Sequence, residues 1–247
     1  MTPATPVGTV GFDGPKARTF AKLDLVEFGD SFRGAPGDKL LGRLRREAGE
    51  LFSFVMRIPV VLSDPRSCPP GSKRPALPYL PVGSWPEDPF DAGELGQAAW
   101  SWVIGSAEKL GAVALFLQTG AGFRPTTDNR KRLSSFFEGA PRPIRIAWDS
   151  QGLFSREDQA AICRDLDLLQ TLDPLLDGTI PADEAYLRAV GRSRTRRGLS
   201  SDELHLLMEA MEELSFCLLA LHTPNSFRDA LALKRLLGEP ERPSDEP

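Results

Sequence analysis

The chain has 247 residues, 41% of them hydrophobic and 26% charged, with 34 acidic against 30 basic residues and a formal net charge of −4. This composition supports a sizeable buried core, and it excludes nucleic-acid binding driven by an overall positive charge. The presence of only two histidines and three cysteines excludes a histidine-rich metal centre and gives little support to a disulfide framework or a cysteine zinc site.

No apolar run reaches the length of a membrane span, and the first ten residues lack the charged start and apolar centre of a secretion signal. We therefore expect no membrane association and a cytoplasmic location. Residues 1–6 and 239–247 are rich in proline or charge, and we expect both of these end segments to be disordered.

Between the ends, short apolar segments alternate with longer amphipathic ones. The short segments have the length and residue types of strands, which we predict at residues 7–12, 22–28, 52–59, 112–118, 144–149, 185–190 and 216–223, with a weaker pattern at 166–172. The longer segments have a helical period, and they predict helices at residues 37–48, 91–110, 127–139, 156–166, 200–214 and 226–237. Two helices carry start signals: TTDN at residues 126–129, and the capping-box pair Ser200 and Glu203.

This alternation, repeated about eight times, is typical of parallel strands joined by right-handed crossovers. A closed (β/α)8 barrel of the TIM type fits the strand pattern and the chain length better than an open sheet. We therefore predict an α/β fold with a single barrel domain at residues 7–238. No sequence repeat is visible.

One stretch, residues 59–89, breaks the alternation and holds nine of the 22 prolines. A long loop without regular structure is usually functional or mobile. Because it follows the third predicted strand, it would lie over the carboxyl-terminal mouth of a barrel as a lid. The alternative is an irregular excursion packed on the outside of the barrel. The sequence favours neither.

A series of short motifs follows in order along almost the whole chain. They are VGTVGF at 7–12, VEFGDSFR at 26–33, MRIP at 56–59, FLQTGAGF at 116–123, AWDSQGLF at 147–154, YLRAVGR at 186–192 and LHT at 221–223. In this order and spacing the chain resembles a divergent member of the domain-of-unknown-function seventy-two family, also called YecE-like proteins. The resemblance implies a TIM-type barrel, in agreement with the strand pattern, and no established activity.

Several polar residues of that family's strand ends are replaced in this chain. The resemblance aligns Ala147 and Asp149 with a glutamate and an arginine, Val190 with a histidine, and His222 and Thr223 with two asparagines. The residues that keep the family type include Glu27, Phe32, Gln118, Tyr186, Arg188 and Arg192. The resemblance therefore implies a degenerate site, and it leaves open whether the chain is an enzyme.

Residues at the carboxyl ends of barrel strands face a shared pocket, so they can form a site without a sequence motif. The polar residues at these positions are Asp13, Glu27, Asp30, Ser31, Arg57, Gln118, Asp149, Arg188, Arg192, His222 and Asn225. Three of them are arginines, whose guanidinium groups pair with phosphate, sulfate or carboxylate through two parallel hydrogen bonds.

Two of these residues are candidates for catalysis. Glu27 beside Arg57 or Arg188 would orient an arginine or act as a general base. His222 lies where a proton shuttle could act. In the structural alternative, Glu27 and an arginine form a buried pair and His222 caps the last helix.

A run of arginines, GRSRTRRG at residues 191–198, follows the seventh predicted strand. This run could hold a ligand phosphate or contact nucleic acid, but charge runs in loops are usually only solvated. No aromatic residues are interleaved with the arginines to stack on bases, so we do not expect nucleic acid as a partner.

Two short segments are similar to those of a serine esterase. VEFGDSF at 26–32 is similar to the G-D-S block of GDS-type hydrolases, and DELH at 202–205 to their D-x-x-H block. Ser31, His205 and Asp202 would then be nucleophile, base and orienting acid. The G-x-N-D block of those enzymes is absent, and DELH opens an amphipathic helix, where acidic residues are favoured by the helix dipole.

We therefore expect a barrel protein that binds a small anionic ligand, bearing phosphate or carboxylate, at its carboxyl-terminal mouth. The ligand-binding residues would be Arg57, Gln118, Asp149, Arg188 and Arg192, with no metal and no cofactor. Two alternatives stay open. One is a non-enzymatic scaffold with a degenerate site, which binds a protein partner through the proline-rich or the arginine loop. The other is a GDS-type serine esterase that uses Ser31.

Overall fold

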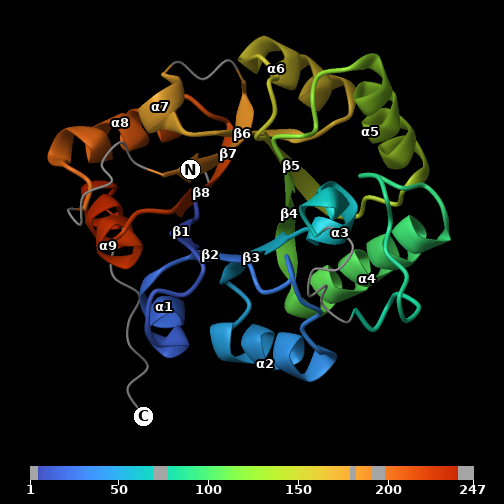
Figure 1. Cartoon of the computed structure of the whole chain (residues 1–247). Helices are drawn as coiled ribbons and strands as arrows, with labels where there is room; N and C mark the ends of the chain where they lie inside the picture. The colour runs from blue at the N-terminus through green and yellow to red at the C-terminus, as the bar shows by residue number, and fades with distance from the viewer. Residues whose placement is uncertain (1–4, 69–76, 179–181, 191–197, 239–247) are drawn as a thin grey trace. The chain divides into compact units, whose positions relative to one another are not determined.

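The computed structural model describes residues 5–68, 77–178, 182–190 and 198–238. Its eight strands are parallel and follow one another round a closed barrel in the order β1-β2-β3-β4-β5-β6-β7-β8 (Figure 1). Their bounds are β1 Val7–Val10, β2 Leu25–Phe28, β3 Ser53–Arg57, β4 Ala112–Thr119, β5 Arg145–Ser150, β6 Leu169–Leu172, β7 Glu184–Ala189 and β8 Phe216–Leu221. Each predicted strand is present, including the weaker one, and the TIM-type (β/α)8 fold is confirmed.

Helices separate the strands along the chain: α1 Lys16–Lys22, α2 Asp38–Ala48, α3 Val60–Ser63, α4 Glu94–Leu110, α5 Thr127–Gly139, α6 Arg156–Asp165, α7 Pro174–Asp177, α8 Ser201–Glu212 and α9 Ser226–Leu236, with a 3-10 helix, η1, at Pro65–Ser67. The six predicted helices are all found. The short helices α1, α3 and α7 are not predicted by the sequence, because segments of four to seven residues do not show a helical period. The strand predicted at 22–28 is wrong at its start, because Lys22 ends α1. Within the described part of the chain, no helix is long and apolar enough to cross a membrane.

Side chains cap the helices where the sequence indicates. Ser200 accepts a hydrogen bond from the Glu203 backbone N–H, and the Glu203 carboxylate accepts one from the Ser200 N–H, which completes the capping box of α8. Thr126 caps α5 by accepting from the N–H of Asn129. Each cap satisfies backbone donors that the first turn of a helix leaves unpaired.

The chain folds as two compact units. Unit 1 contains Met1–Phe28, Leu44–Val55 and Gln170–Pro247, and unit 2 contains Gly29–Arg43 and Met56–Leu169. Unit 1 is therefore assembled from three separate segments of the chain, whereas one long segment supplies most of unit 2.

In unit 1, the strands lie side by side in the order β2, β1, β8, β7 and β6. Leu187, Leu219 and Leu221 point to one face of this sheet and join a hydrophobic cluster with Leu207 of α8 and Leu233 of α9. Figure 1 shows α8 and α9, in orange and red, beside β8 and β1. Because side chains alternate along a strand, the residues between these leucines point to the opposite face.

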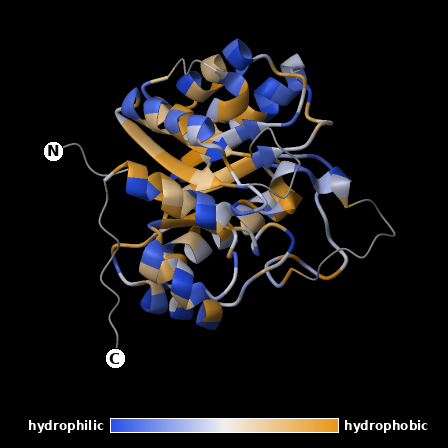
Figure 2. Cartoon of the chain, turned by 90° about the vertical axis from the view of Figure 1, so that its left-hand side faces the viewer, coloured by the Kyte–Doolittle hydropathy of each residue, from blue (hydrophilic) through white to orange (hydrophobic). Residues whose placement is uncertain are grey.

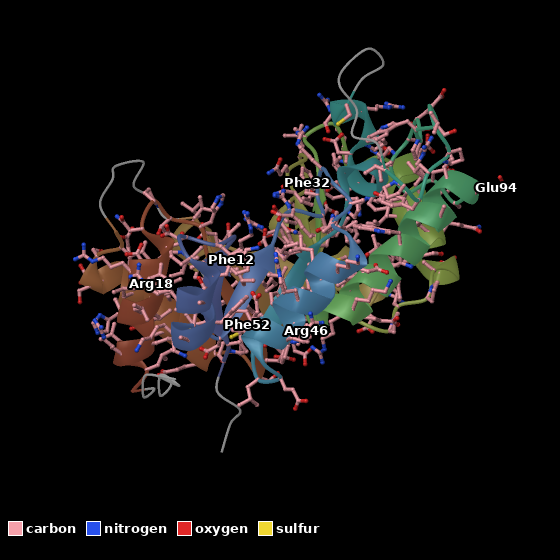
Figure 3. All side chains as sticks on the ribbon, turned by 90° about the horizontal axis from the view of Figure 1, so that it is seen from below. Phe12, Arg18, Phe32, Arg46, Phe52 and Glu94 are labelled. Atoms are coloured by element: carbon pink, nitrogen blue, oxygen red, sulfur yellow. The ribbon has the colours of Figure 1, made fainter. Side chains whose placement is uncertain are left out.

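Helix α1 is attached to α9 and to a cluster of phenylalanines. The Arg18 guanidinium lies 4.0 Å from the ring centroid of Phe227, and Figure 3 shows Arg18 beside the ribbon of α9. The ring of Phe20 meets those of Phe12 and Phe52 edge to face, with centroids 5.6 and 5.0 Å apart. Contacts of these two kinds each contribute on the order of 1 kcal/mol beyond the burial of area.

In unit 2, β4 and β5 pair in parallel from Ala114 and Arg145 to Thr119 and Ser150. On the helices, Trp100 of α4 packs edge to face against Phe136 of α5, with ring centroids 5.4 Å apart. Figure 2 shows the strands mostly in the hydrophobic colour and the helices in both colours. This is the pattern of buried parallel strands covered by amphipathic helices.

The described residues of the proline-rich stretch pack onto other parts of unit 2. The ring of Tyr79 stacks on Trp102 of α4 with centroids 4.7 Å apart, and the Trp85 indole N–H donates to the Pro65 carbonyl at 3.1 Å. Helices α3 and η1 also lie within the stretch, so the expectation of a loop without regular structure is wrong there. These contacts favour the packed excursion over the lid.

The three cysteines are buried free thiols. Burial raises the pKa of the Cys163 thiol to about 12 and also raises the pKa of Cys217. At pH 8 only about one in 10⁴ of the Cys163 side chains is then a thiolate.

We expect iodoacetamide to label Cys163 at least about 100-fold more slowly in native than in urea-unfolded protein. Mass spectrometry of the alkylated peptides measures both rates, and equal rates would contradict the burial.

Candidate functional site

Three of the predicted ligand-binding residues lie together in unit 2, at the carboxyl ends of β3, β4 and β5. Arg57 is the last residue of β3, and Gln118 and Asp149 are register partners near the ends of β4 and β5. Arg57 Nη2 donates to Gln118 Oε1, and Gln118 Nε2 donates to Asp149 Oδ2 at 2.8 Å. The amide of Gln118 therefore links the guanidinium to the carboxylate.

Aromatic side chains also hold the Arg57 guanidinium. Its central carbon lies 4.0 Å from the ring centroid of Phe32 and 5.7 Å from that of Phe116. The backbone of Phe32 is itself anchored, because its carbonyl accepts a hydrogen bond from the N–H of Val60 at 2.8 Å. A ring face and an amide together keep the guanidinium plane in one orientation.

Asp64 is a further acidic residue at these strand ends, and the sequence prediction does not include it. Its carboxylate lies against Gly120, which follows β4: a Cβ on Gly120 would be 2.1 Å from Asp64 Oδ2. Burial raises the pKa of Asp64, while the backbone N–H of Ser67 and the charge of Arg33 act in the opposite direction. The glycine after the strand in FLQTGAGF is the signal that could have indicated this close approach.

In unit 1, Glu27 at the end of β2 meets two residues of β7. The Tyr186 hydroxyl donates to Glu27 Oε2 at 2.8 Å, and Arg188 Nε donates to the same oxygen at 2.9 Å. Glu27 and Tyr186 are fully buried, and 10% of the Arg188 side chain is exposed. Arg188, one of the two arginines considered as partners of Glu27, thus pairs with it.

Small residues on β1 and β8, the two strands between β2 and β7, make this meeting possible. In the register of the sheet, Arg188 lies opposite Ala220, Ala220 opposite Gly8, and Gly8 opposite Leu25. Glu27 is two residues beyond Leu25, so its side chain lies on the same face of the sheet. Glu27 and Arg188 can therefore reach each other across Gly8 and Ala220, which present little or no side chain.

Asp13 and His222 make their described contacts with other residues. Arg192 and most of the arginine run lie outside the described residues. The side chain of His222 is exposed, and its backbone N–H donates to the carbonyl of Ala189 at 2.8 Å. Asp13 Oδ2 accepts a hydrogen bond of 3.5 Å from the N–H of Phe227, in the first turn of α9.

The residues of the esterase alternative make contacts with backbone carbonyls. The Ser31 hydroxyl is fully buried and donates to the carbonyl oxygen of Arg57 at 2.5 Å. His205 is exposed on α8, with Nδ1 at 2.8 Å from the carbonyl oxygen of Ser201. Neither contact is one that activates a nucleophile, so no observation favours this alternative.

A cavity of about 680 Å³ in unit 2 is lined by Trp85 and Asp88 of the proline-rich stretch and by Lys131 and Arg132 of α5. Asp88 pairs there with Arg132 at 2.6 Å, and hydrogen bonding to that arginine lowers the pKa of the Asp88 carboxyl. None of the predicted ligand-binding residues lines this cavity.

Within the described part of the chain, no group of three or more histidine, cysteine, aspartate or glutamate side chains could hold a metal ion.

The closed ring of eight parallel strands, with polar side chains at the carboxyl ends of several of them, defines a TIM-type barrel protein. No protein-family model matches the sequence, and no curated protein matches it either. Among solved structures, the chain is similar to the DUF72 (domain-of-unknown-function seventy-two) family protein EF0366 from Enterococcus faecalis V583. The TM-score of this match is 0.67 and the sequence identity is 15%. The match covers 96% of this chain and 98% of that one.

The chain is also similar to the DUF72 family protein TM1631 from Thermotoga maritima MSB8. The TM-score is 0.64 and the identity 16%, covering 95% of this chain and 99% of that one. The family resemblance drawn from the ordered motifs is thereby confirmed at the level of the fold.

The substitution Gly8→Ala tests the close approach of β1 to β2. A Cβ on Gly8 would lie 1.8 Å from the carbonyl oxygen of Leu25, so the two strands would have to move apart. We expect a loss of about 1–3 kcal/mol in the free energy of unfolding, measured by urea titration. Gly29→Ala is the matched control, because a Cβ there meets nothing within 4 Å, and it should change stability by less than about 0.5 kcal/mol. Equal losses would contradict the close approach.

The substitution Asp64→Asn tests the environment of Asp64 through its pH dependence. Because the folded-state pKa is raised, the favourable contribution of Asp64 is present below its unfolded-state pKa and is lost as pH rises through the folded-state value. Asparagine cannot ionise, so the unfolding free energy of the variant relative to wild type should increase between about pH 4 and about pH 7. Urea titrations at the two pH values measure this, and a constant or falling difference would contradict the raised pKa.

Proposed function

We propose that the protein binds a small organic anion, bearing a carboxylate or a phosphate, at the carboxyl ends of β3, β4 and β5 in unit 2. Arg57 is the residue that pairs with the anionic group. The observation that carries this proposal is the fixed orientation of the Arg57 guanidinium, with the Phe32 ring over its face and Gln118 at one edge. The position agrees with the end of the strands at which barrel proteins bind their ligands.

A guanidinium held in this way favours anion binding for two reasons. The guanidinium carries a positive charge, and its described contacts with Phe32 and Gln118 are with uncharged groups. The side chain is also ordered before a ligand arrives, so little rotational freedom is lost on binding, and its planar fork matches the oxygens of carboxylate and phosphate. Arg188 donates its Nε to the Glu27 carboxylate, and this ion pair offsets part of its charge.

Asp149 restricts the kind of anion. This half-buried carboxylate accepts a hydrogen bond from Gln118 and lies one amide away from Arg57. Its negative charge repels a bare anion, but a ligand that also carries a hydroxyl or amino group can donate a hydrogen bond to it. We therefore propose an anion with an O–H or N–H donor, such as a hydroxy acid, an amino acid or a phosphorylated alcohol.

Binding, rather than a defined reaction, is what the geometry supports. The candidate His222 is exposed and makes its described backbone contact with β7, and Glu27 is bonded to Tyr186 and Arg188. A role in catalysis for either residue, and the cytoplasmic location, stay predictions.

The proposal is tested by thermal unfolding of the protein with glycolate, serine and glycerol 3-phosphate, and with acetate as an anion that lacks a donor group. A ligand at 100 times its Kd adds about 2.7 kcal/mol to the free energy of unfolding, which raises the Tm by about 5 °C or more. We expect Arg57→Met to weaken binding of the responding probe by about 30-fold or more, because the charge is lost while the length is kept. The affinity of Arg57→Lys for the probe should lie between those of wild type and Arg57→Met.

Arg130→Met is the matched control for Arg57→Met. Arg130 also belongs to unit 2 and lies near an aromatic ring, with its guanidinium carbon 5.6 Å from the centroid of Phe154, but it pairs with Asp158 on α6. This variant should bind the probe as wild type does. The proposal fails if Arg57→Met binds normally, if Arg130→Met loses as much affinity, or if no probe shows a shift that depends on Arg57.

A further inference from the structure

The Glu27 carboxylate of unit 1 has one oxygen that the fold does not use. Tyr186 and Arg188 both donate to Oε2, whereas Oε1 is buried and has no hydrogen-bond partner among the described residues. Glu27 as a whole is 0% exposed. A buried carboxylate oxygen without a donor is costly, and such atoms are rare in native structures, so each one calls for a reason.

A second ion pair of the same unit also gathers its donors on one carboxylate oxygen. Asp24 pairs with Lys234 of α9, and its Oδ2 also accepts from the backbone N–H of Val7 at 3.4 Å. The pairs differ in burial: the Asp24 side chain is 16% exposed, whereas that of Glu27 is 0% exposed and its second oxygen is buried. In Glu27 both donors come from β7 and crowd onto one oxygen, which leaves the other oxygen for a group that the fold does not supply.

Thr171 provides a second, independent observation on the same sheet. It lies on β6 opposite Tyr186 in the register of the strands, so its side chain shares a face with the Tyr186 ring. Thr171 is 4% exposed, and its hydroxyl also has no hydrogen-bond partner among the described residues. Two buried polar atoms without described partners thus lie on the face of the sheet that carries the Tyr186 ring. The Thr171 hydroxyl oxygen is on the neighbouring strand β6, and Glu27 Oε1 belongs to the carboxylate that the Tyr186 hydroxyl bonds.

We infer that this face of unit 1 is a binding site for a neutral ligand with several hydroxyl groups, such as a polyol or a sugar. Oε1 of Glu27 accepts a hydrogen bond from one ligand hydroxyl, and the Thr171 hydroxyl bonds another. The Tyr186 ring lies between these two groups and packs against the C–H groups of the ligand. The inference is separate from the anion site proposed in unit 2 and does not depend on it.

The charges of the site select a neutral ligand. Arg188 donates to Glu27 at 2.9 Å, so the positive charge of the guanidinium repels an ammonium group that approaches Oε1. The carboxylate of Glu27 repels an anion in turn. A hydroxyl group avoids both repulsions, can donate to Glu27 and accept from Thr171, and is small enough for an enclosed position.

Arg188 is the most exposed residue of the site. Glu27, Tyr186 and Thr171 are each at least nine-tenths buried, whereas 10% of the Arg188 side chain reaches solvent. Arg188 is therefore the member of this cluster that reaches solvent, and the other three residues lie in an enclosed position. Enclosure removes competing water and strengthens each hydrogen bond in the site.

The test uses isothermal titration and thermal unfolding with glycerol, D-glucose and myo-inositol, and with 1,2-propanediol and 2-deoxy-D-glucose as partners that lack one hydroxyl. Concentrations stay in the millimolar range, below those at which polyols stabilise proteins by exclusion from the surface. We expect a polyol to bind wild type more tightly than its deoxy partner. Glu27→Gln and Thr171→Val should each weaken that binding by about tenfold.

Thr171→Val also has a distinctive effect on the free protein, which keeps the inference testable if Glu27→Gln fails to fold. Valine replaces a buried hydroxyl that has no partner, so the Tm of the ligand-free variant should rise while polyol affinity falls. Thr9→Val is the matched control: the Thr9 hydroxyl is buried and donates to the Gly11 carbonyl at 2.8 Å. This control should lose stability and keep polyol affinity.

The inference is overturned if no polyol binds wild type in preference to its deoxy partner, or if Thr171→Val binds polyols as wild type does. Glycolate binding, measured on the same variants, shows whether the anion site of unit 2 is intact. Glu27→Gln and Thr171→Val should retain glycolate binding, and Arg57→Met should retain polyol binding. Loss of both ligands on Thr171→Val or on Arg57→Met would contradict two separate sites and overturn the inference.

Discussion

The approach of β1 to β2 at Gly8 is the constraint on which the polar interior of unit 1 depends. The carbonyl oxygen of Leu25 occupies the space that a side chain at position 8 would need. With Ala220 as the neighbour of Gly8 on β8, the two strands between β2 and β7 offer almost no side-chain volume on this face. A glutamate and an arginine from separate strands can therefore meet there, and a buried carboxylate is tolerable only when it is paired in this way.

The two polar clusters use their arginines differently. In unit 1 the guanidinium of Arg188 is bonded directly to a carboxylate, which places a nearly neutral pair in a buried position. In unit 2 an amide stands between Arg57 and Asp149, and an aromatic ring lies over the guanidinium. The first arrangement suits hydroxyl groups, and the second leaves charges of both signs in reach of a ligand. One barrel thus provides two chemically distinct environments at its strand ends.

Much of the fold could be predicted from the sequence, because buried parallel strands appear as short apolar runs and the amphipathic helices between them have a clear period. The gathering of Arg57, Gln118 and Asp149 follows from their places at strand ends. The close approaches at Gly8 and Gly120 and the position of Thr171 could not be predicted, because they depend on the register of strands and on approaches between backbones that no local pattern records. For the same reason the sequence left open which arginine pairs with Glu27.

During synthesis, the segments of unit 2 are completed before those of unit 1. β1 precedes the other strands of the barrel in the chain and pairs with β8, which follows them. Asp24 pairs with Lys234, which lies 210 residues later in the chain. Every segment of unit 2 exists once residue 169 has been added, while unit 1 still lacks its third segment. Until then the edge of β1 that β8 will cover has no partner, and unpaired strand edges invite association with other chains. The sheet that carries Glu27 can thus close only after the segments of unit 2 have been made, and the unpaired edge of β1 is open to association with other chains until then.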